Sequence, residues 1–481
     1  MAYIFKNEPY QHQRDVLLKS WNKEAWAWFL EMGTGKTFIS LNNAGILFER
    51  ELIDTLIVLA PKGVFQNWSS IEIPKHLPER IERNVVVWRP SPNKKQKEAL
   101  TDLITEPSVK LKILVMNIES LSTKKGLNYL EMVLKANKAM LVIDESTTIK
   151  SPTAKRTKSL LKLAKLAHYR RILSGFPVTQ SPMDLWSQCK FLGDELLGAY
   201  SKSFHHFQHH YAIIKRQNMG GHSFNMVVGY RNLDELSETL KGFSSRVTKE
   251  ECLDLPPKNY ITRDIELTED QGRIYMELKD YCVAHLEDAE FMTTNNVMTQ
   301  LIRMQQVLSG HTKSDSGELI EIKNNRLNEL LSCCAEISGK IVIFSRFRYD
   351  IQNITRELNK VYGLGAAVSY YGDTDNDARV AAIDDFQEGK ARFFVSNPVT
   401  GGYGITLTAS QTVIYYANSF DLSSRMQSES RIHRMGQEGR CVTYIDFVCR
   451  NSIDEQITKA LKSKMDISLK VLGEQLENWL Q

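Results

Sequence analysis

The sequence predicts an α/β protein in which two parallel-sheet domains flank a mostly helical segment. Three observations predict this fold. The chain has 481 residues, more than one hydrophobic core usually supports. Two regions, at about 9–195 and 325–450, alternate short β-branched runs with longer helical patterns, which is typical of parallel βαβ units. The residues between them have helical spacing, so we expect domains at 1–195 and 321–481 around an insertion at 196–320.

Short apolar runs mark the expected strands in chain order. In the first domain they are 26–30, 55–60, 113–116, 139–143 and 171–174, and in the second they are 340–344, 366–370, 392–395, 412–416 and 442–447. Runs this short favour buried strands over helices. The tail from Ser452 has apolar residues four apart at Ile453, Ile457 and Leu461, which predicts a helix that packs on one of the domains.

Composition excludes several classes of protein. With 42% hydrophobic residues, 26 glycines and 13 prolines, the chain is neither disordered nor collagen-like. No apolar run is long enough to span a membrane, and the first residues lack a secretory signal. Seven scattered cysteines without a C-x-x-C pair favour a reducing, cytoplasmic compartment over a disulfide framework or a zinc ribbon. The net charge of +4 is too small to identify a nucleic-acid partner.

A glycine-rich segment follows the first expected strand and precedes a helical pattern. The residues that would meet a nucleotide are Gly33, Thr34, Gly35, Lys36 and Thr37. Small residues let backbone N–H groups surround phosphate oxygens at a helix N-terminus, Lys36 can reach the β- and γ-phosphates, and the Thr37 hydroxyl can bind Mg²⁺. The strict pattern has glycine where Leu30 stands, and the alternative is a turn that only caps a helix. The flanking strand and helix favour a phosphate-binding loop.

A carboxylate pair, Asp144-Glu145, ends the apolar run 139–143. In a parallel sheet the carboxyl ends of the strands face the ligand crevice. Asp144 would there hold Mg²⁺, and Glu145 would orient and deprotonate the attacking water. The alternative is a helix cap, which is common when such a pair stands alone.

Two arginines near the end of the second domain, Arg431 and Arg434, stand three residues apart. On a helix they would share a face and could stabilise charge on a transferring γ-phosphoryl group. Their spacing alone favours the alternative, a solvated basic helix face.

The motifs, taken in order, resemble those of the superfamily-two helicases, and within them the Swi/Snf-type DNA-dependent ATPases and translocases. The matching segments are 9–13 (the glutamine motif), 59–68 (motif Ia), 117–120 (motif Ib), 144–150 (the Asp-Glu box), 174–180 (motif III), 343–347 (motif IV), 401–408 (motif V) and 427–437 (motif VI). They cover nearly all of the chain. The string Arg-Ile-His-Arg-Met-Gly-Gln in motif VI points to the Swi/Snf branch over RNA helicases.

The resemblance implies two RecA-like lobes that use ATP and Mg²⁺ to move along DNA. It implies that Gln11 or Gln13, of which Gln13 is preferred, reads adenine, and that Gly404 of motif V lines the nucleotide site. It also implies that Arg431 and Arg434 act as arginine fingers. We expect a compact, monomeric enzyme of prokaryotic or viral type.

Two departures from the family pattern leave alternatives open. Thr147 stands where the family's box usually has His, and Phe176 stands where motif III usually has Thr. Both positions are implicated in coupling hydrolysis to movement. The alternatives are a strand-separating or fork-reannealing helicase, and a DNA-binding assembly subunit that uses ATP only as a switch.

Basic residues after the box are candidates for phosphate contacts. They are Lys150, Lys155, Arg156 and Lys158, extended by Lys162, Lys165, Arg170 and Arg171. A solvated helix face is the alternative for any one of them. Aromatic spacing for a single-strand stacking platform is not evident, which favours duplex DNA. The histidine pairs at 205/209 and 206/210 have helical spacing, but without an accompanying Glu or Cys they favour a polar or nucleic-acid-facing helix over a metal site.

Overall fold

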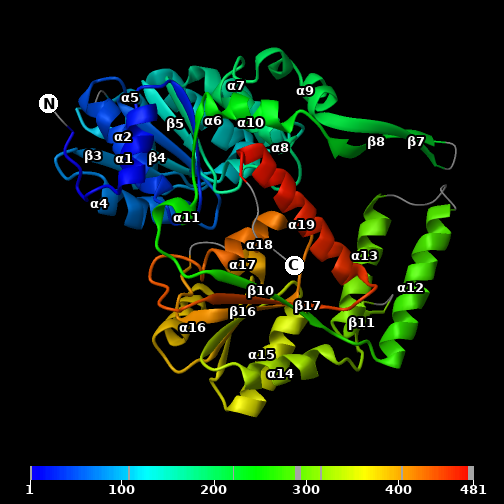
Figure 1. Ribbon diagram of the computed structural model, residues 1–481. Coiled ribbons are helices and arrows are strands. Elements are labelled where there is room, and N and C mark those ends of the chain that lie inside the picture. Colours follow the sequence, from blue (N-terminus) through cyan, green and yellow to red (C-terminus); the bar gives the residue numbers. More distant parts are fainter. Residues whose placement is uncertain are drawn as a thin grey trace. The chain divides into compact units, whose positions relative to one another are not determined.

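The computed structural model describes residues 3–106, 109–219, 222–287, 294–314, 317–401 and 405–474. The chain divides into two compact units, each built on a parallel sheet (Figure 1). Among the described residues, the first unit comprises those within 3–213, 229–254 and 467–474, and the second comprises those within 214–228 and 255–466. The predicted fold class, α/β with two parallel-sheet lobes, is confirmed.

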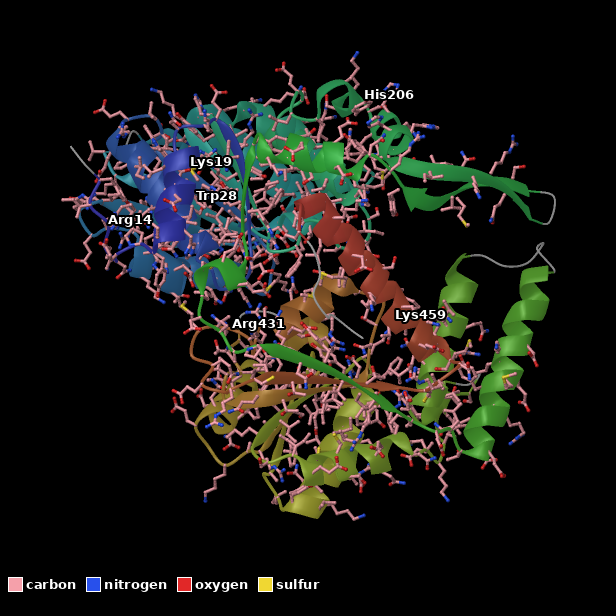
Figure 2. All side chains as sticks on the ribbon, viewed as in Figure 1. Arg14, Lys19, Trp28, His206, Arg431 and Lys459 are labelled. Atoms are coloured by element: carbon pink, nitrogen blue, oxygen red, sulfur yellow. The ribbon has the colours of Figure 1, made fainter. Side chains whose placement is uncertain are left out.

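The first unit contains a seven-stranded sheet in the order β3-β4-β2-β5-β6-β1-β9, and its neighbouring strands are parallel. Its strands are β1 (Ala25–Leu30), β2 (Thr55–Ala60), β3 (Arg83–Val87), β4 (Leu111–Asn117), β5 (Ala139–Ile143), β6 (Tyr169–Leu173) and β9 (Ser244–Val247). All residues of β2 and β5 are buried, as expected for central strands that helices cover on both faces. Figure 2 shows Trp28 of β1 in this unit, where its side chain is fully buried in the main core.

The first unit also contains helices. They are α1 (Gln11–Ser20), α2 (Lys36–Glu49), α3 (Phe65–Asn67), α4 (Ile73–His76), α5 (Lys94–Thr105), α6 (Lys124–Ala136), α7 (Lys155–Leu163), α8 (Asp184–Leu192), α9 (Phe204–Tyr211), α10 (Leu233–Lys241) and α11 (Lys249–Cys252). Helix α6 is amphipathic and buries Leu130, Val133 and Leu134. Helix α2, in contrast, is buried from Phe38 to Leu47, so the residues that follow the phosphate-binding loop are held firmly in the core.

The second unit contains a six-stranded parallel sheet in the order β10-β17-β16-β13-β15-β14. Its strands are β10 (Lys258–Asp264), β13 (Lys340–Ser345), β14 (Ala367–Tyr370), β15 (Phe393–Ser396), β16 (Ser410–Ala417) and β17 (Val442–Val448). Its helices are α12 (Glu269–Glu287), α13 (Thr294–Leu308), α14 (Arg326–Glu336), α15 (Arg348–Tyr362), α16 (Asn376–Gln387), α17 (Pro398–Gly401) and α18 (Leu422–Glu429). Helix α19 (Ile453–Leu472) begins in this unit, and its residues from Ile467 group with the first unit. Phe344, Tyr415 and Tyr444 are among the core residues.

The segment 196–320 contains strands as well as helices. It holds the pair β7 (Ala212–Met219) and β8 (His222–Tyr230), and the antiparallel β11 (His311–Lys313) joins β12 (Leu319–Glu321) at its end. Strand β9 from this segment joins the first sheet, and β10 joins the second. Among the described residues, no helix combines the length and apolar character that a membrane span needs.

Candidate nucleotide-binding site

Three segments of the first unit meet at one edge of its sheet. Strands β1, β5 and β6 are neighbours and parallel, so Leu30, Ile143 and Leu173 all end at the same side. The phosphate-binding loop, the carboxylate pair and motif III follow these strand ends. Motif III also lies against the loop, because a Cβ added at Gly175 would stand 3.4 Å from the Met32 nitrogen.

The phosphate-binding loop depends on glycine backbone conformations. Gly33 has φ +91° and Gly35 has φ +94°, and Gly35 caps the N-terminus of α2. A Cβ at Gly35 would come within 2.1 Å of Gln13 Nε2, so no side chain fits there without displacing that amide. Lys36 Nζ donates to the Leu30 carbonyl at 2.9 Å, which places the ammonium group on the inner side of the loop.

The structure distinguishes between the two candidate glutamines. Gln13 is 6% exposed, its Nε2 donates to the Thr34 carbonyl at 3.3 Å, and its Oε1 accepts from the Tyr10 N–H at 3.1 Å. Gln11 is exposed and donates to Asp15. Gln13 therefore contacts the loop and Gln11 does not. Sequence reasoning missed His12, whose Nε2 lies 2.8 Å from the same Thr34 carbonyl.

Asp144 is held from two sides. Trp68 Nε1 donates to its Oδ2 at 2.9 Å, and the Glu145 N–H donates to its Oδ1 at 3.0 Å. Burial raises the pKa of Asp144, while the Trp68 hydrogen bond and the charge of Lys36 act in the opposite direction. Glu145 has φ +50°, an unusual conformation for a residue with a side chain. Such strain is found where the surrounding structure holds a side chain in a required direction.

Motif III and the box are joined by side chains other than those at 147 and 176. Ser146 Oγ donates to Gln188 Oε1 at 2.6 Å, and Gln188 Nε2 donates to the Pro177 carbonyl at 2.8 Å. Lys150 Nζ donates to Thr179 Oγ1 at 2.7 Å. Two chains of hydrogen bonds therefore connect the segments after β5 and after β6, although Thr147 and Phe176 depart from the family pattern.

The predicted helical face for Arg431 and Arg434 is wrong. Helix α18 ends at Glu429, and both arginines lie on the turns that follow (Figure 2 labels Arg431). The Leu407 N–H donates to the Arg431 carbonyl at 3.0 Å, and Arg434 Nη1 approaches the Ile405 carbonyl at 3.4 Å. Motif VI is thus attached to the end of motif V. Gly404 lies outside the described residues.

A buried network in the second unit includes the last residue of α18. Arg425 Nε donates to Glu429 Oε1 at 2.7 Å, and its Nη2 donates to Asp446 Oδ2 at 2.9 Å. The guanidinium lies 3.6 Å from the Tyr415 ring centroid, and Tyr260 donates to Glu429 at 2.8 Å. All these charges are buried, so they hold the start of motif VI in a single position.

The basic cluster after the box does not form one surface. Arg171 is fully buried, where it donates to Asn43 Oδ1 at 3.1 Å and to the Ser20 carbonyl at 3.2 Å. Burial lowers the pKa of Arg171 to about 9. The expectation that Arg171 extends a nucleic-acid face is therefore wrong, because its β6 position points inward. The exposed lysines of α7 are Lys155, Lys158 and Lys162.

The histidines lie on α9, where His206 is exposed (Figure 2). His210 stacks on Tyr200 with ring centroids 3.7 Å apart and pairs with Glu235 at 3.0 Å. Within the described part of the chain, no three His, Cys, Asp or Glu side chains are grouped to hold a metal ion.

Two family models match the chain. The model described as SNF2-related domain matches residues 16–314, and the Helicase conserved C-terminal domain matches residues 322–436. The family that the motifs predicted is confirmed.

Relatives extend the match to most of the chain. An uncharacterized ATP-dependent helicase of Mycoplasma pneumoniae is 23% identical over 96% of this chain and 43% of its own length. The CHD3-type chromatin-remodeling factor PICKLE of Arabidopsis thaliana is 22% identical over 97% of this chain and 34% of its own length. The putative ATP-dependent helicase/translocase YwqA of Bacillus subtilis is 24% identical over 71% of this chain and 36% of its own length. The chain thus spans well under half the length of these relatives.

Among solved structures, a Sulfolobus solfataricus SWI2/SNF2 ATPase core in complex with dsDNA matches at 22% identity and a TM-score of 0.43. The match covers 97% of this chain and 94% of that chain.

Proposed function

Since this chain belongs to the SNF2 family, we propose that it is an ATP-driven motor that moves along duplex DNA. The observation that carries the proposal is the single sheet edge at which the phosphate-binding loop, Asp144 and motif III meet. Relatives named as ATP-dependent helicases and as a helicase/translocase support the use of ATP.

The substrate would be ATP with its Mg²⁺ ion. Lys36 and the N-terminus of α2 would bind the β- and γ-phosphates. The oxygen ligands that suit Mg²⁺ are the Thr37 hydroxyl, in the first turn of α2, and the Asp144 carboxylate, which Trp68 and Glu145 orient. A cation beside Asp144 would favour its charged form and offset the effect of burial.

Glu145 would accept the proton of the attacking water. Its backbone is held in a strained conformation, and its N–H holds Asp144. Gln13 would read adenine, because it contacts the loop that would bind the phosphates. Arg431 and Arg434 of motif VI would neutralise the charge that develops on the γ-phosphoryl group.

ATPase rates with duplex DNA, single-stranded DNA and RNA test the proposal. We expect the strongest stimulation by duplex DNA. Lys36→Ala should abolish hydrolysis, and Lys95→Ala, an exposed lysine on α5, is its control. Arg434→Ala should slow turnover and leave ATP binding intact, with exposed Arg440→Ala as its control. If no nucleic acid stimulates the ATPase rate, the proposed motor function is refuted.

Movement is tested separately from hydrolysis. Displacement of a third strand from a triplex reports translocation along duplex DNA, whereas release of one strand from a forked duplex reports strand separation. We expect displacement of the third strand without release of a strand from the forked duplex. An ATPase that displaces no third strand would instead support the use of ATP only as a switch.

A further inference from the structure

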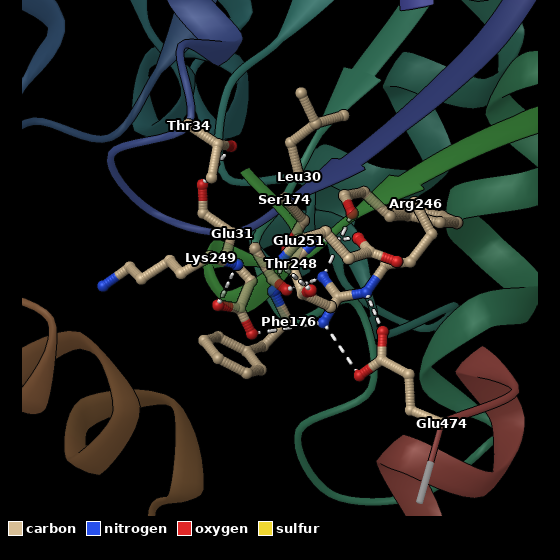
Figure 3. A network of polar contacts seen from close by, with 12 residues as sticks. Leu30, Glu31, Thr34, Ser174, Phe176, Arg246, Thr248, Lys249, Glu251 and Glu474 are labelled. Atoms are coloured by element: carbon tan, nitrogen blue, oxygen red, sulfur yellow. Dashed lines mark hydrogen bonds and ion pairs between the residues drawn. The ribbon is translucent and has the colours of Figure 1, made fainter. Parts of the chain in front are cut away.

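Arg246, on strand β9, lies at the centre of a polar network beside the phosphate-binding loop (Figure 3). Strand β9 pairs with β1 so that Arg246 stands opposite Phe29. Its Nη1 donates to the Phe29 carbonyl at 3.0 Å and to the Gly175 carbonyl at 2.9 Å. The side chain is 15% exposed, so these bonds form in a largely water-free environment.

The same guanidinium binds two carboxylates. Arg246 Nη2 lies 3.3 Å from Glu31 Oε1 and 3.1 Å from Glu474 Oε2, and its Nε donates to the other oxygen of Glu474. Glu31 is the residue between strand β1 and the loop, and its second carboxylate oxygen accepts from the Lys249 N–H at 3.1 Å. Its carbonyl accepts from Thr34 Oγ1 at 2.8 Å. Glu31 therefore connects Arg246 directly to the loop.

The end of helix α19 fixes Glu474. Gly473 has φ +75°, and the Glu474 N–H donates to the Leu469 carbonyl at 2.8 Å, which is the pattern that terminates helices at a glycine. Val471 is fully buried, and with Leu472 it lines a hollow of about 90 Å³ that Leu240 and Arg246 also line. The C-terminal segment Ile467–Glu474 is thus packed on the first unit, and the Glu474 side chain points at Arg246.

The charges indicate how this arrangement would affect nucleotide binding. Glu31 stands at the entrance of a loop that binds an anion, so its carboxylate would repel phosphate if Arg246 did not neutralise it. Glu474 supplies a charge-assisted bond that orients the guanidinium toward Glu31 and the two carbonyls. When Glu474 is absent, Arg246 gains rotational freedom, and the loop loses a fixed neighbour.

We propose that Arg246 is a positioning residue for the phosphate-binding loop and that Glu474 holds it there, so that attachment of the segment Ile467–Glu474 strengthens ATP binding. The proposal rests on the proposed ATPase activity. It gives the segment Ile467–Glu474 a role in the nucleotide site that no motif in the sequence suggests.

Glu474→Gln is the decisive variant, because it removes one charge and keeps the size of the side chain. Its control is Glu238→Gln on α10, an exposed carboxylate that pairs with Lys241 at 2.5 Å and does not contact Arg246. We measure the KM for ATP and kcat with saturating duplex DNA, and the Tm of each variant. We expect the loss of Arg246 orientation to outweigh the removal of one negative charge near the loop, so Glu474→Gln should raise KM about fivefold. Glu238→Gln should leave KM unchanged.

A purely structural role has a different signature. It would lower Tm and the fraction of active enzyme, while KM of the remaining enzyme stayed at the wild-type value. Arg246→Lys keeps the charge and loses most of the hydrogen bonds, so it should raise KM about tenfold. If Arg246→Lys does not fold, the comparison of KM between Glu474→Gln and Glu238→Gln still tests the proposal. Equal KM values for Glu474→Gln and Glu238→Gln would overturn the proposal.

Binding of a fluorescent ATP analogue without DNA separates this proposal from the motor function. The affinity of the wild type and of Glu474→Gln is then compared without any need for hydrolysis. If the wild-type protein binds nucleotide but no nucleic acid stimulates its ATPase activity, only the motor function is refuted. A wild-type motor whose affinity for the analogue is unaffected by Glu474→Gln would refute the role of Glu474 only.

Discussion

The buried ion pair between Arg326 and Asp454 permits a quantitative prediction for the second unit. Arg326 begins α14, Asp454 lies in the first turn of α19, and their side chains are 1% and 7% exposed. Arg326 also donates to the Tyr416 carbonyl and contacts Cys449 Sγ at 3.2 Å. Asp454→Asn would remove the anion and leave the guanidinium charge buried without its counter-charge.

Removing one partner of a buried pair typically costs about 3–5 kcal/mol. Asparagine keeps one acceptor oxygen, so we expect a loss at the lower end of this range, about 3 kcal/mol of the free energy of unfolding. For a unit of this size the loss corresponds to a Tm decrease of about 6–12 °C. Replacing both residues with apolar ones, Arg326→Met with Asp454→Leu, should recover much of the loss, because no charge then remains buried.

Thermal unfolding of the full chain, followed by calorimetry, measures this effect. The matched control is Asp264→Asn, which removes the exposed ion pair with Arg450 in the same unit, 2.7 Å long with side chains 50% and 58% exposed. Exposed pairs contribute little, so its Tm should be close to that of the wild type. If Asp454→Asn lowers Tm no more than Asp264→Asn does, the reasoning from burial is wrong.

Three further predictions concern individual residues of the first unit. Gly35→Ala should raise KM for ATP about tenfold or more, because a Cβ would meet Gln13 Nε2 at 2.1 Å in a φ of +94°. Asp184→Ala should destabilise the first unit by about 1.5–3 kcal/mol in urea unfolding, since Oδ2 accepts from the Thr179 N–H and hydroxyl and from the next N–H. Two lysines lower the pKa of Asp194 from 3.8 to about 2. The contribution of Asp194 to the free energy of unfolding is therefore full above about pH 4 and is lost as the pH falls toward 2. Because Asp194 is 46% exposed, Asp194→Asn should cost less than about 1 kcal/mol at pH 6, and the difference from wild type should vanish near pH 2.

Most of the strands that could be predicted are buried on both faces. Runs such as 55–60 and 139–143 match β2 and β5 residue for residue, because a strand covered on both sides must be apolar throughout. Within the two large sheets, the strands missed by the sequence analysis, β3, β9 and β10, stand at sheet edges. An edge strand has one partner and more exposed side chains, so β9 reads Ser-Ser-Arg-Val and has no apolar run to detect.

The candidate site shows a similar division between local and long-range information. The residues of the phosphate-binding loop and the carboxylate pair have local patterns, and the structure places both at the strand ends that the patterns indicated. The contacts of Trp68 with Asp144 and of Arg246 with Glu31 join residues 76 and 215 positions apart. No local pattern specifies such a pair, because what selects the partner is the order of the strands in the sheet.

The buried arginines of this chain indicate what these long-range pairs do. Arg171 joins β6 to α1 and α2, Arg326 joins α14 to β16 and α19, and Arg246 joins β9 to β1, to motif III and to the end of α19. Desolvation of a guanidinium makes such contacts poor sources of stability compared with apolar packing. Their rigid fork instead fixes several chain segments at once. Around Arg171 and Arg326 the segments belong to the core, so loss of contacts should change stability. Around Arg246 they include the loop that would bind ATP, so there the same geometry should change affinity.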